Sequence, residues 1–480
     1  MTSETQSENL KLAGLLGAGA LLEALYLRMH SLYYLKNHAI AFMVLALAAG
    51  IVYLIALYGF DKTQASRASF ILLIFAALVF RATLWPMQPT LSDDLQRYRW
   101  DAKVQANGWN PYVLAPQDPR LAYLRDHYYE IMPGRETPTI YPPATELVYR
   151  AAWKVFPGPT AFKVPFAAAD VLVLLLLAWM FREEKHRSFR VAVYAWNPLV
   201  IVEFAGSGHN DVLALLGIVG GLALLKKRPA LASVPIALAT MAKVFPAVLL
   251  PVWIRRAGWP EKRSGWWGAG LAGASCVLVV LPYWRALGAF RADLAYYEAR
   301  WKNYHASLYT IIDWLTGGGT RIPELLAAAV IWGLALCLAW KRAEPARAAY
   351  LLIGTSLAFW PNGYPWYFTW IVPLLCFFPN PAWLLLTVLQ FLSYNVLIGY
   401  GILGQFKFDP LMQWLVYVPF YTLLVGDWLQ RRNRSSTLDG NQQGGGAMRG
   451  LPNESRNQNN LAVGAGSQDV HVRLRRIFQR

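Results

Sequence analysis

The sequence predicts an all-α polytopic membrane protein with one large water-facing loop. Of its 480 residues, 56% are hydrophobic and only 15% are charged, whereas soluble domains carry about 25% charged residues. Several apolar runs are nearly free of charge over about 20 residues, which is enough to cross the hydrocarbon core of a bilayer. Lys and Arg gather in the short connectors between these runs, as is typical of cytoplasmic loops.

The first three spans are expected at residues 10–29, 39–59 and 68–88, starting from a cytoplasmic N-terminus. Three crossings place the next segment, 89–160, on the outer face. This segment holds eight acidic and eight basic residues, although the whole chain has a formal net charge of +17. The excess positive charge therefore indicates orientation in the membrane, and nucleic acid is not expected as a partner.

The remainder of the chain predicts further spans and one broken hairpin. Residues 230–254 are expected to form a re-entrant hairpin, because Lys243 and Pro246 interrupt the apolar run and basic residues flank both of its ends. The other spans are expected at 161–181, 191–206, 210–225, 266–286, 325–341, 348–360, 366–379, 383–402 and 411–430. Together they form a domain over residues 1–430 with about 12–14 transmembrane helices.

The last segment, residues 431–480, differs from the rest in composition. It is rich in Gly, Asn and Gln and poor in apolar residues, which predicts a disordered basic cytoplasmic tail. The three cysteines lie in apolar segments and are expected to act as packing residues. They are Cys276, Cys337 and Cys376. The sequence contains no metal-ligand motif, and no cofactor is certain.

The outer segment opens with a dense cluster of charge, "SDDLQRYRWDAKVQANGWNPYVLAP". Helical spacing places four side chains on one face of the predicted helix: Asp94, Arg97, Tyr98 and Asp101. Asp93 points about 100° away from that face. A second amphipathic helix is expected within "TPTIYPPATELVYRAAW", which begins at Thr137. One interpretation of the cluster is a salt-bridge network that only anchors the loop at the membrane surface.

The alternative is that a carboxylate here carries out chemistry. Transfer of a sugar from a lipid-linked phosphate needs one base to accept a proton from the acceptor hydroxyl. It also needs cations that hold the departing phosphate. Asp94 or Asp93 is the candidate base, and the neighbouring acids leave a divalent cation open. The candidate cations are Arg97, Arg99, Lys103 and Lys243. Lys243 is also explained by snorkelling of its ammonium to the interface.

Further polar residues occur near the outer ends of predicted spans. "WNPLVIVEFAGSGHNDVLALLG" contains Glu203, His209 and Asp211. Carboxylates within spans are costly and usually face a cavity, so these residues are candidates for binding substrate hydroxyls, with structural hydrogen bonding as the alternative. Asn303 and Tyr141, in two aromatic-rich outer segments, are candidates for the same role.

Five segments together resemble the bacterial polyprenol-phosphate-mannose-dependent mannosyltransferases of the GT-C superfamily of membrane glycosyltransferases. They are "SDDLQRYRWDAKVQANGWNPYVLAP", "YPPATELVY", "WNPLVIVEFAGSGHNDVLALL", "ALATMAKVFPAVLLP" and "PNGYPWYFTWIVPLL". The resemblance implies an inverting enzyme whose essential acid, in the pattern D-x-x-R-Y-x-W-D/E-G, falls on Asp94. This chain departs from the pattern at Ala102, where Gly is usual, and at Gln96, where Tyr is common. Relatives transfer mannose, glucose, arabinose or aminoarabinose.

The leading hypothesis is therefore inverting transfer of a hexose, with mannose favoured, from a polyprenyl-phosphate donor to an acceptor glycan or lipid. The reaction would take place on the outer, periplasmic face of the bacterial inner membrane. Asp94, supported by Asp93, would be catalytic, and Arg97 and Lys243 would hold the phosphate. The predicted substrate-binding residues are Tyr98, Asp101, Tyr141, Glu203, His209, Asp211 and Asn303. A transporter or flippase of lipid-linked sugars is the main alternative, although charge concentrated in one outer loop does not favour it. A non-catalytic membrane partner is the third.

Overall fold

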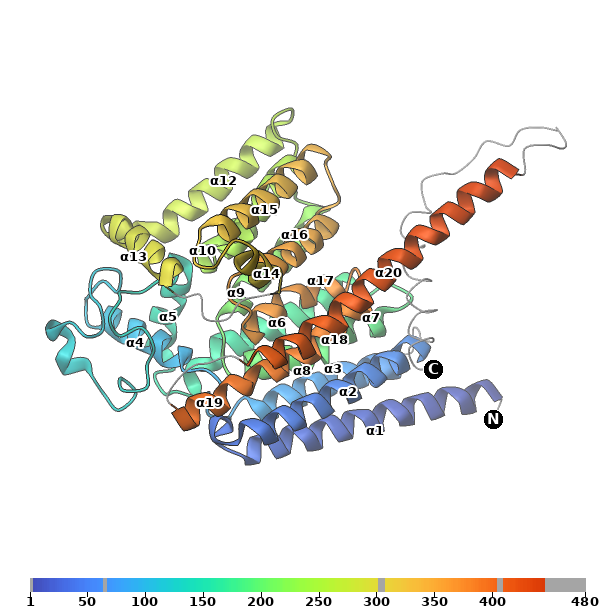
Figure 1. Ribbon diagram of the computed structural model, residues 1–480, viewed down its shortest axis with the longest axis horizontal. Helices are drawn as coiled ribbons and strands as arrows, with labels where there is room; N and C mark the ends of the chain where they lie inside the picture. The colour runs from blue at the N-terminus through green and yellow to red at the C-terminus, as the bar shows by residue number, and fades with distance from the viewer. Residues whose placement is uncertain (1–2, 64–66, 301–306, 404–408, 445–480) are drawn as a thin grey trace.

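The computed structural model describes residues 3–63, 67–300, 307–403 and 409–444. Every regular element in these ranges is helical (Figure 1), which confirms the predicted all-α class. Seven of the described helices are long and apolar enough to cross a membrane, and two shorter helices are also apolar. The total of 12–14 transmembrane helices remains a prediction, because several expected spans are divided into shorter pieces.

The first three long helices pack side by side along one side of the molecule (Figure 1). They are α1 (Ser3–Ser31), α2 (Ala39–Thr63) and α3 (Arg67–Leu84), and the short 3₁₀-helix η1 (Leu35–His38) joins the first two. Their close approach depends on small residues, because Gly59 of α2 lies directly against the Leu15 side chain of α1. The three expected N-terminal spans are confirmed, with ends shifted by a few residues.

The large loop follows α3 and lies at one end of the bundle, here called the loop end (Figure 1). It contains α4 (Asp94–Ala106), η2 (Pro119–Leu124), α5 (Pro143–Val155) and η3 (Ala161–Lys163), and it leads into α6 (Val164–Met180). Helices α4 and α5 pack on each other. A small apolar core of its own, which includes Trp100, Leu121 and Met132, keeps the loop compact.

The predicted span 191–206 is interrupted. It contains the end of α7 (Arg187–Ala195), the short α8 (Pro198–Val200) and a π-helical turn, η4 (Ile201–Gly206), before α9 (Asp211–Leu225) begins. Asn197 causes the break, because its side chain accepts hydrogen bonds from the Leu199 and Val200 N–H groups and thereby caps a new helix. Pro198 fits the first position of that helix, where no N–H is needed.

The predicted hairpin is confirmed. It consists of α10 (Ser233–Ala242), η5 (Phe245–Leu249) and α11 (Leu250–Arg256), and Lys243 at the break is extended with φ −149° and ψ 140°. Gly221 of α9 lies against both Ile236, before the break, and Trp253, after it. Residues on either side of Lys243 therefore reach the same level of α9, so the chain turns back at Lys243.

The remaining elements complete the bundle. They are α12 (Arg263–Val280), η6 (Leu281–Ala286), α13 (Leu287–Arg300), α14 (Ser307–Leu315), α15 (Ile322–Trp340), α16 (Pro345–Phe359), η7 (Pro365–Ile371), α17 (Val372–Leu375), α18 (Pro381–Leu389), η8 (Gln390–Asn395), α19 (Val396–Leu403) and α20 (Pro410–Gly444). Helix α20 extends beyond residue 431, where the disordered tail was expected to begin. Residues 445–480 lie outside the described part, so the tail remains a prediction.

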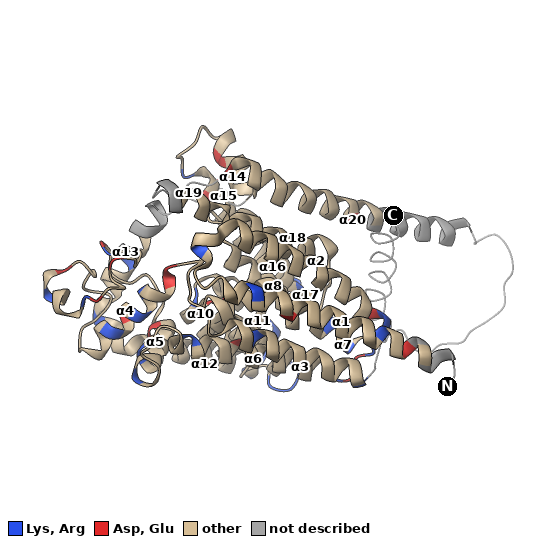
Figure 2. Ribbon diagram, turned by 90° about the horizontal axis from the view of Figure 1, so that it is seen from below, with Lys and Arg blue, Asp and Glu red and all other residues tan. Residues whose placement is uncertain are grey.

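The basic connectors lie at the end of the bundle opposite the loop end. Arg342, after α15, pairs with Glu261, after α11, at 2.7 Å. Arg190 of α7 donates to the Cys376 carbonyl oxygen at 3.0 Å, after α17. In Figure 2, ribbon segments coloured for charged residues occur in α4 and α5 at the loop end and again near α7 at the other end. The two ends are therefore chemically distinct, as the positive-inside pattern requires.

Candidate active site

The two adjacent carboxylates at the start of α4 have different surroundings. Asp93 forms an ion pair with Lys36 of η1, with 2.8 Å between Oδ2 and Nζ. The Lys36 ammonium also lies over the Tyr400 ring, 4.4 Å from its centroid. The Asp94 carboxylate, in contrast, has no ion pair among the described residues. Asp93 thus anchors α4 to the N-terminal helices, and Asp94 is left available.

Asp94 is partly buried at the N-terminal end of α4, where its backbone N–H donates to Ser92 Oγ at 3.2 Å. Burial raises the pKa of the Asp94 carboxyl, and the positive charges of His209 and Lys243 oppose that rise. The negative charge of Asp211 adds to the rise in the pKa of Asp94. A carboxylate with a raised pKa and no fixed partner has the properties of a general base.

Lys243 lies at the tip of the hairpin and is held by the start of α9. Its Nζ donates to Asp211 Oδ2 at 3.0 Å and to Asn210 Oδ1 at 3.1 Å. The other Asp211 oxygen accepts from Trp370 Nε1 of η7 at 2.7 Å. An ammonium has three donors, so the part of the chain that the structure describes leaves one donor of Lys243 for a ligand. The break after α10 therefore places the Lys243 ammonium beside the start of α9.

His209 is held between an aromatic ring and a buried carboxylate. Its ring stacks on Trp366 of η7, with 4.3 Å between centroids and an angle of 20°. Its Nδ1 lies 2.9 Å from Glu203 Oε2, an ion-pair distance without a well-aligned hydrogen bond. Tyr394 donates to the other Glu203 oxygen. Glu203 is fully buried, so it lies behind His209 and positions it.

The turn that carries His209 is stabilised by a buried lysine that the sequence analysis missed. Lys163 Nζ donates to the carbonyl oxygens of Met87, Ala205 and Gly206 at 2.7, 3.2 and 2.8 Å. Gly208 has φ +75°, and a Cβ there would lie 2.7 Å from the Lys163 side chain. The glycine is therefore required both by its backbone conformation and by the close lysine. The sequence offers no signal for this contact.

Tyrosine rings form one wall beside Asp94. Tyr98 of α4 stacks on Tyr149 of α5, with centroids 4.8 Å apart and an angle of 15°, and the Tyr141 ring meets Tyr98 edge-on at 5.0 Å. Asn210 Nδ2 donates to the Tyr149 hydroxyl at 2.6 Å. This bond ties the loop helices to the start of α9. Through this bond and the stacked pair of Tyr149 and Tyr98, the start of α9 is linked to the helix that carries Asp94.

Comparison with known proteins now gives the family. Residues 7–257 match the family model described as "Alpha-(1->6)-mannopyranosyltransferase, N-terminal domain". The chain belongs to this family. It is 25% identical over 401 residues to alpha-(1->6)-mannopyranosyltransferase A of Mycobacterium tuberculosis (strain ATCC 25618 / H37Rv), which covers 75% of this chain and 76% of the relative. No solved structure matches.

The protein is therefore a membrane glycosyltransferase of the mannopyranosyltransferase family. The matched segment includes Asp94, His209, Asp211 and Lys243. The aromatic residues of η7 that contact this group, Trp366 and Trp370, lie beyond it. The sequence analysis missed both as individual residues, although "PNGYPWYFTWIVPLL" was among the segments that resemble the superfamily.

Arg97 does not join the site in the way the sequence led us to expect. Its Nε donates to both oxygens of Asp101, at 3.0 and 3.1 Å. Its two terminal nitrogens donate to the carbonyl oxygens of Gly134 and Thr137. The guanidinium is buried, and three partners within the loop engage it. Arg97 and Asp101 therefore hold the loop in shape, and this geometry does not support a phosphate-binding role for Arg97.

Glu146 of α5 is a second buried carboxyl that was not predicted, although it lies within the quoted "YPPATELVY". Thr139 Oγ1 donates to its Oε1 and Gln105 Nε2 donates to its Oε2, each at 2.7 Å. Burial, together with the negative charge of Asp101, raises the pKa of Glu146 well above its usual range. The loop therefore binds a proton at Glu146 more tightly when folded than when unfolded.

This raised pKa predicts a pH effect on stability that Glu146→Gln removes. The contribution of protonated Glu146 to the free energy of unfolding is fully present below the unfolded pKa of about 4.3. It is lost as pH rises through the higher pKa that Glu146 has in the folded protein. Glutamine can accept from Gln105 and donate to Thr139, so the variant should keep both hydrogen bonds. We expect the melting temperature of the wild type to fall more steeply between pH 5 and pH 8 than that of the variant. Equal slopes would show that Glu146 is ionised in the folded loop.

Two predictions about the site are not tested by this geometry. Asn303 lies outside the described residues. Among the described residues, no group of three or more His, Cys, Asp or Glu side chains is arranged to hold a metal ion, and the requirement for a divalent cation remains open. The three cysteines are unpaired. Cys376 is buried, Cys276 is partly buried and Cys337 is exposed on the helix surface.

Proposed function

We propose that the protein transfers mannose from a polyprenyl-phosphate donor to a mannose-containing acceptor, with inversion at the anomeric carbon. The observation that carries this proposal is the difference in surroundings between two neighbouring acids. Asp93 is paired with Lys36, whereas the Asp94 carboxylate has no ion pair among the described residues and experiences the positive charge of Lys243. The name of the mycobacterial relative, an alpha-(1->6)-mannopyranosyltransferase, supports mannose as the sugar and an α-(1→6) bond as the product. The loop end would face the exterior, because the basic connectors lie at the other end.

In this reaction the acceptor hydroxyl attacks the anomeric carbon of the donor, and its proton passes to Asp94. The bond between that carbon and the phosphate oxygen breaks, and the electron pair leaves with the polyprenyl phosphate. The remaining donor of Lys243 would stabilise the negative charge that develops on this phosphate. The phosphate is already a good leaving group, so the site needs no general acid. Asp94 then releases its proton to water.

The rings and polar groups around Asp94 suit the two substrates. Tyr141, which is partly buried and meets the fully buried Tyr98 edge-on, would pack against the face of a sugar ring. The buried His209 Nε2 has no hydrogen-bond partner among the described residues, and it would bind a donor hydroxyl. Tyr367 lies below the Lys243 ammonium, 5.5 Å from it, and would shield the phosphate from water.

Purified protein in detergent, given labelled polyprenyl-phosphate mannose and a synthetic mannoside, tests this proposal. We expect the mannoside to become labelled, with one equivalent of polyprenyl phosphate released for each sugar transferred. Detergent removes the two compartments that a flippase needs, so transfer there identifies an enzyme. The absence of transfer in detergent, combined with movement of labelled lipid across the bilayer of proteoliposomes, would support the flippase instead.

A further inference from the structure

The π-helical turn η4 brings His209 onto Glu203 through two contacts. The His209 backbone N–H donates to the Glu203 carbonyl oxygen at 3.0 Å, and His209 Nδ1 lies 2.9 Å from Glu203 Oε2. The ring is also sandwiched into a stack, because Trp366 packs on His209 and Tyr364 packs on Trp366, with 4.6 Å between centroids and an angle of 4°. These contacts fix the buried imidazole in one orientation, with Nδ1 beside Glu203 and Nε2 at the opposite edge of the ring.

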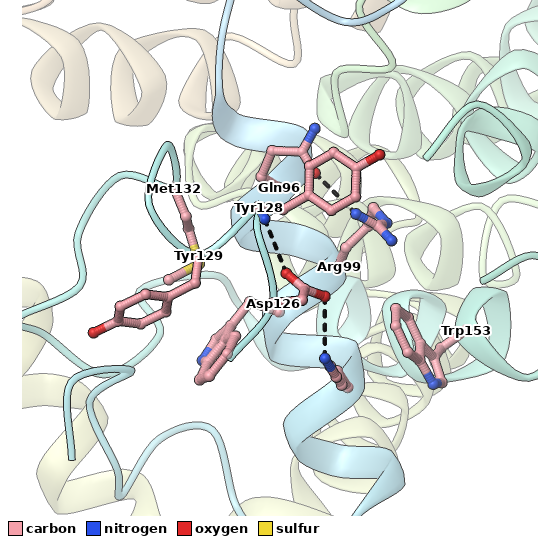
Figure 3. A pocket seen from close by; sticks show the side chains of 9 residues that line it. Gln96, Arg99, Asp126, Tyr128, Tyr129, Met132 and Trp153 are labelled. Atoms are coloured by element: carbon pink, nitrogen blue, oxygen red, sulfur yellow. Dashed lines mark hydrogen bonds and ion pairs between the residues drawn. The ribbon is translucent and has the colours of Figure 1, made fainter. Parts of the chain in front are cut away.

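His209 Nε2 differs from the polar groups of α4, which satisfy one another. Figure 3 shows such pairs: Arg99 donates to Gln96 Oε1 at 3.0 Å, and Lys103 Nζ lies 3.1 Å from Asp126 Oδ2. Among the described residues, no group forms a hydrogen bond with His209 Nε2. Leaving a buried polar atom without a partner costs free energy, which a ligand bound at Nε2 would recover.

Glu203 is a fully buried carboxylate whose cationic partner can only be His209 in the part of the chain that the structure describes. Tyr394 donates to Glu203 Oε1, and His209 is the one titratable group within ion-pair distance of Oε2. A buried carboxylate requires a compensating positive charge. An imidazolium supplies it, because its Nδ1 proton faces Glu203 while its Nε2 proton stays available for a ligand.

We propose that Glu203 is a positioning residue that keeps His209 charged, so that the Nε2–H of His209 donates to a hydroxyl oxygen of the donor sugar and its positive charge acts on Asp94. The identity of the ligand rests on the proposed function, whereas the charge of His209 does not. Burial lowers the pKa of His209, but Glu203, Asp94 and Asp211 together outweigh burial and raise it above its ordinary value. The charge of His209 in turn opposes the rise in the pKa of Asp94.

The other charged groups around His209 and Asp94 come from several elements. They are Asp211 of α9, Lys163 of η3 behind the turn, Lys243 at the hairpin tip, and Asp93 of α4 with its partner Lys36 of η1. Within the described residues, only Glu203 lies within ion-pair distance of His209. A change at Glu203 therefore alters the charge of His209 and leaves these other groups in place.

The first test compares the pH dependence of single-turnover transfer in the wild type and Glu203→Gln. Tyr394 would still donate to the side-chain oxygen, so the amide N–H₂ of the glutamine donates to His209 Nδ1 and the ring becomes neutral with its proton on Nε2. We expect the midpoint of the pH–rate curve to rise by about one pH unit, because a nearby positive charge no longer favours ionised Asp94. The plateau rate at high pH should stay close to that of the wild type, since Nε2–H still binds the sugar.

Two further variants separate charge from packing. Glu203→Asp keeps the carboxylate, so its midpoint should equal that of the wild type even if the shorter side chain lowers the plateau rate. Glu146→Gln is the matched control, because it neutralises another fully buried acid of the chain. Its midpoint should also equal that of the wild type.

The second test measures the charge of His209 directly, by nuclear magnetic resonance of full-length protein with isotope-labelled histidine, in detergent and without donor. The chain has seven histidines, and the His209 signals are those that His209→Asn removes. We expect two protonated ring nitrogens in the wild type at pH 6. A neutral His209 ring in the wild type at pH 6, or equal midpoints in the wild type and Glu203→Gln, would overturn the inference. Failure of the proposed function is distinguishable, because it appears as a charged His209 without transfer from any donor.

Discussion

Replacing Asp94 by Asn lowers the rate of sugar transfer by about 10²–10⁴-fold, the usual contribution of a positioned general base. Asparagine has nearly the same shape, so helix α4 and donor binding are expected to persist. The loss should appear in kcat under single-turnover conditions with donor already bound. In the wild type the rate should rise with pH through a pKa above 3.9, the ordinary value for Asp, because burial raises the pKa of Asp94 and only the ionised base accepts a proton.

The matched control is Asp93→Asn, one residue away. This change removes the ion pair with Lys36, in which both side chains are about a quarter exposed. Partly exposed pairs contribute about 1 kcal/mol or less, so a small loss of stability and most of the activity should remain. Strong inactivation by Asp93→Asn with retained activity in Asp94→Asn would reverse the assignment of the base.

Replacing Lys243 by Met lowers both activity and stability. Removing the cation that we propose to face the departing phosphate should reduce kcat by about 10²-fold. It also leaves Asp211, which is fully buried, without its ion pair. Breaking a buried pair in this way costs about 3–5 kcal/mol, and the low end applies because Lys243 is 19% exposed. The two effects are measured by transfer rate and by thermal unfolding in detergent.

The double variant Lys243→Met/Asp211→Asn separates these effects. It removes the unpaired charge, so most of the stability should return while the activity stays low. Lys227→Met in the exposed connector after α9 serves as a control for loss of a positive charge. If the double variant regained full activity, the role of Lys243 would be structural only.

Hydropathy was sufficient to predict the membrane class and the large loop, because long apolar runs have no alternative to burial in lipid or protein. Hydropathy did not predict the breaks at Asn197 and in η7. There a helix cap and prolines divide apolar runs that an averaged hydropathy treats as single spans. The break at Lys243 was predictable for the opposite reason: a charge and a proline interrupt one short run. Local sequence thus located the elements, and side-chain hydrogen bonds determined where they end.

The candidate site shows a sharper limit. Helical spacing separated Asp93 from Asp94 by direction but could not assign a role to either, because the deciding partner, Lys36, lies 57 residues away. The i, i+4 spacing of Arg97 and Asp101 was visible in the sequence and allowed an ion pair. The burial of this ion pair depends on the carbonyl oxygens of Gly134 and Thr137, which accept from Arg97. Helical spacing alone could not predict these distant partners. Partners distant in sequence decided which charged residues remain available.

The anomeric configuration of the product tests the central claim, that Asp94 acts as a base in a single displacement. Labelled donor of known configuration is converted with a simple mannoside, and the new linkage is assigned by nuclear magnetic resonance. We predict a configuration opposite to that of the donor, because the acceptor attacks the face away from the phosphate. Retention of configuration would contradict the account, since a single displacement from the face away from the phosphate cannot produce it.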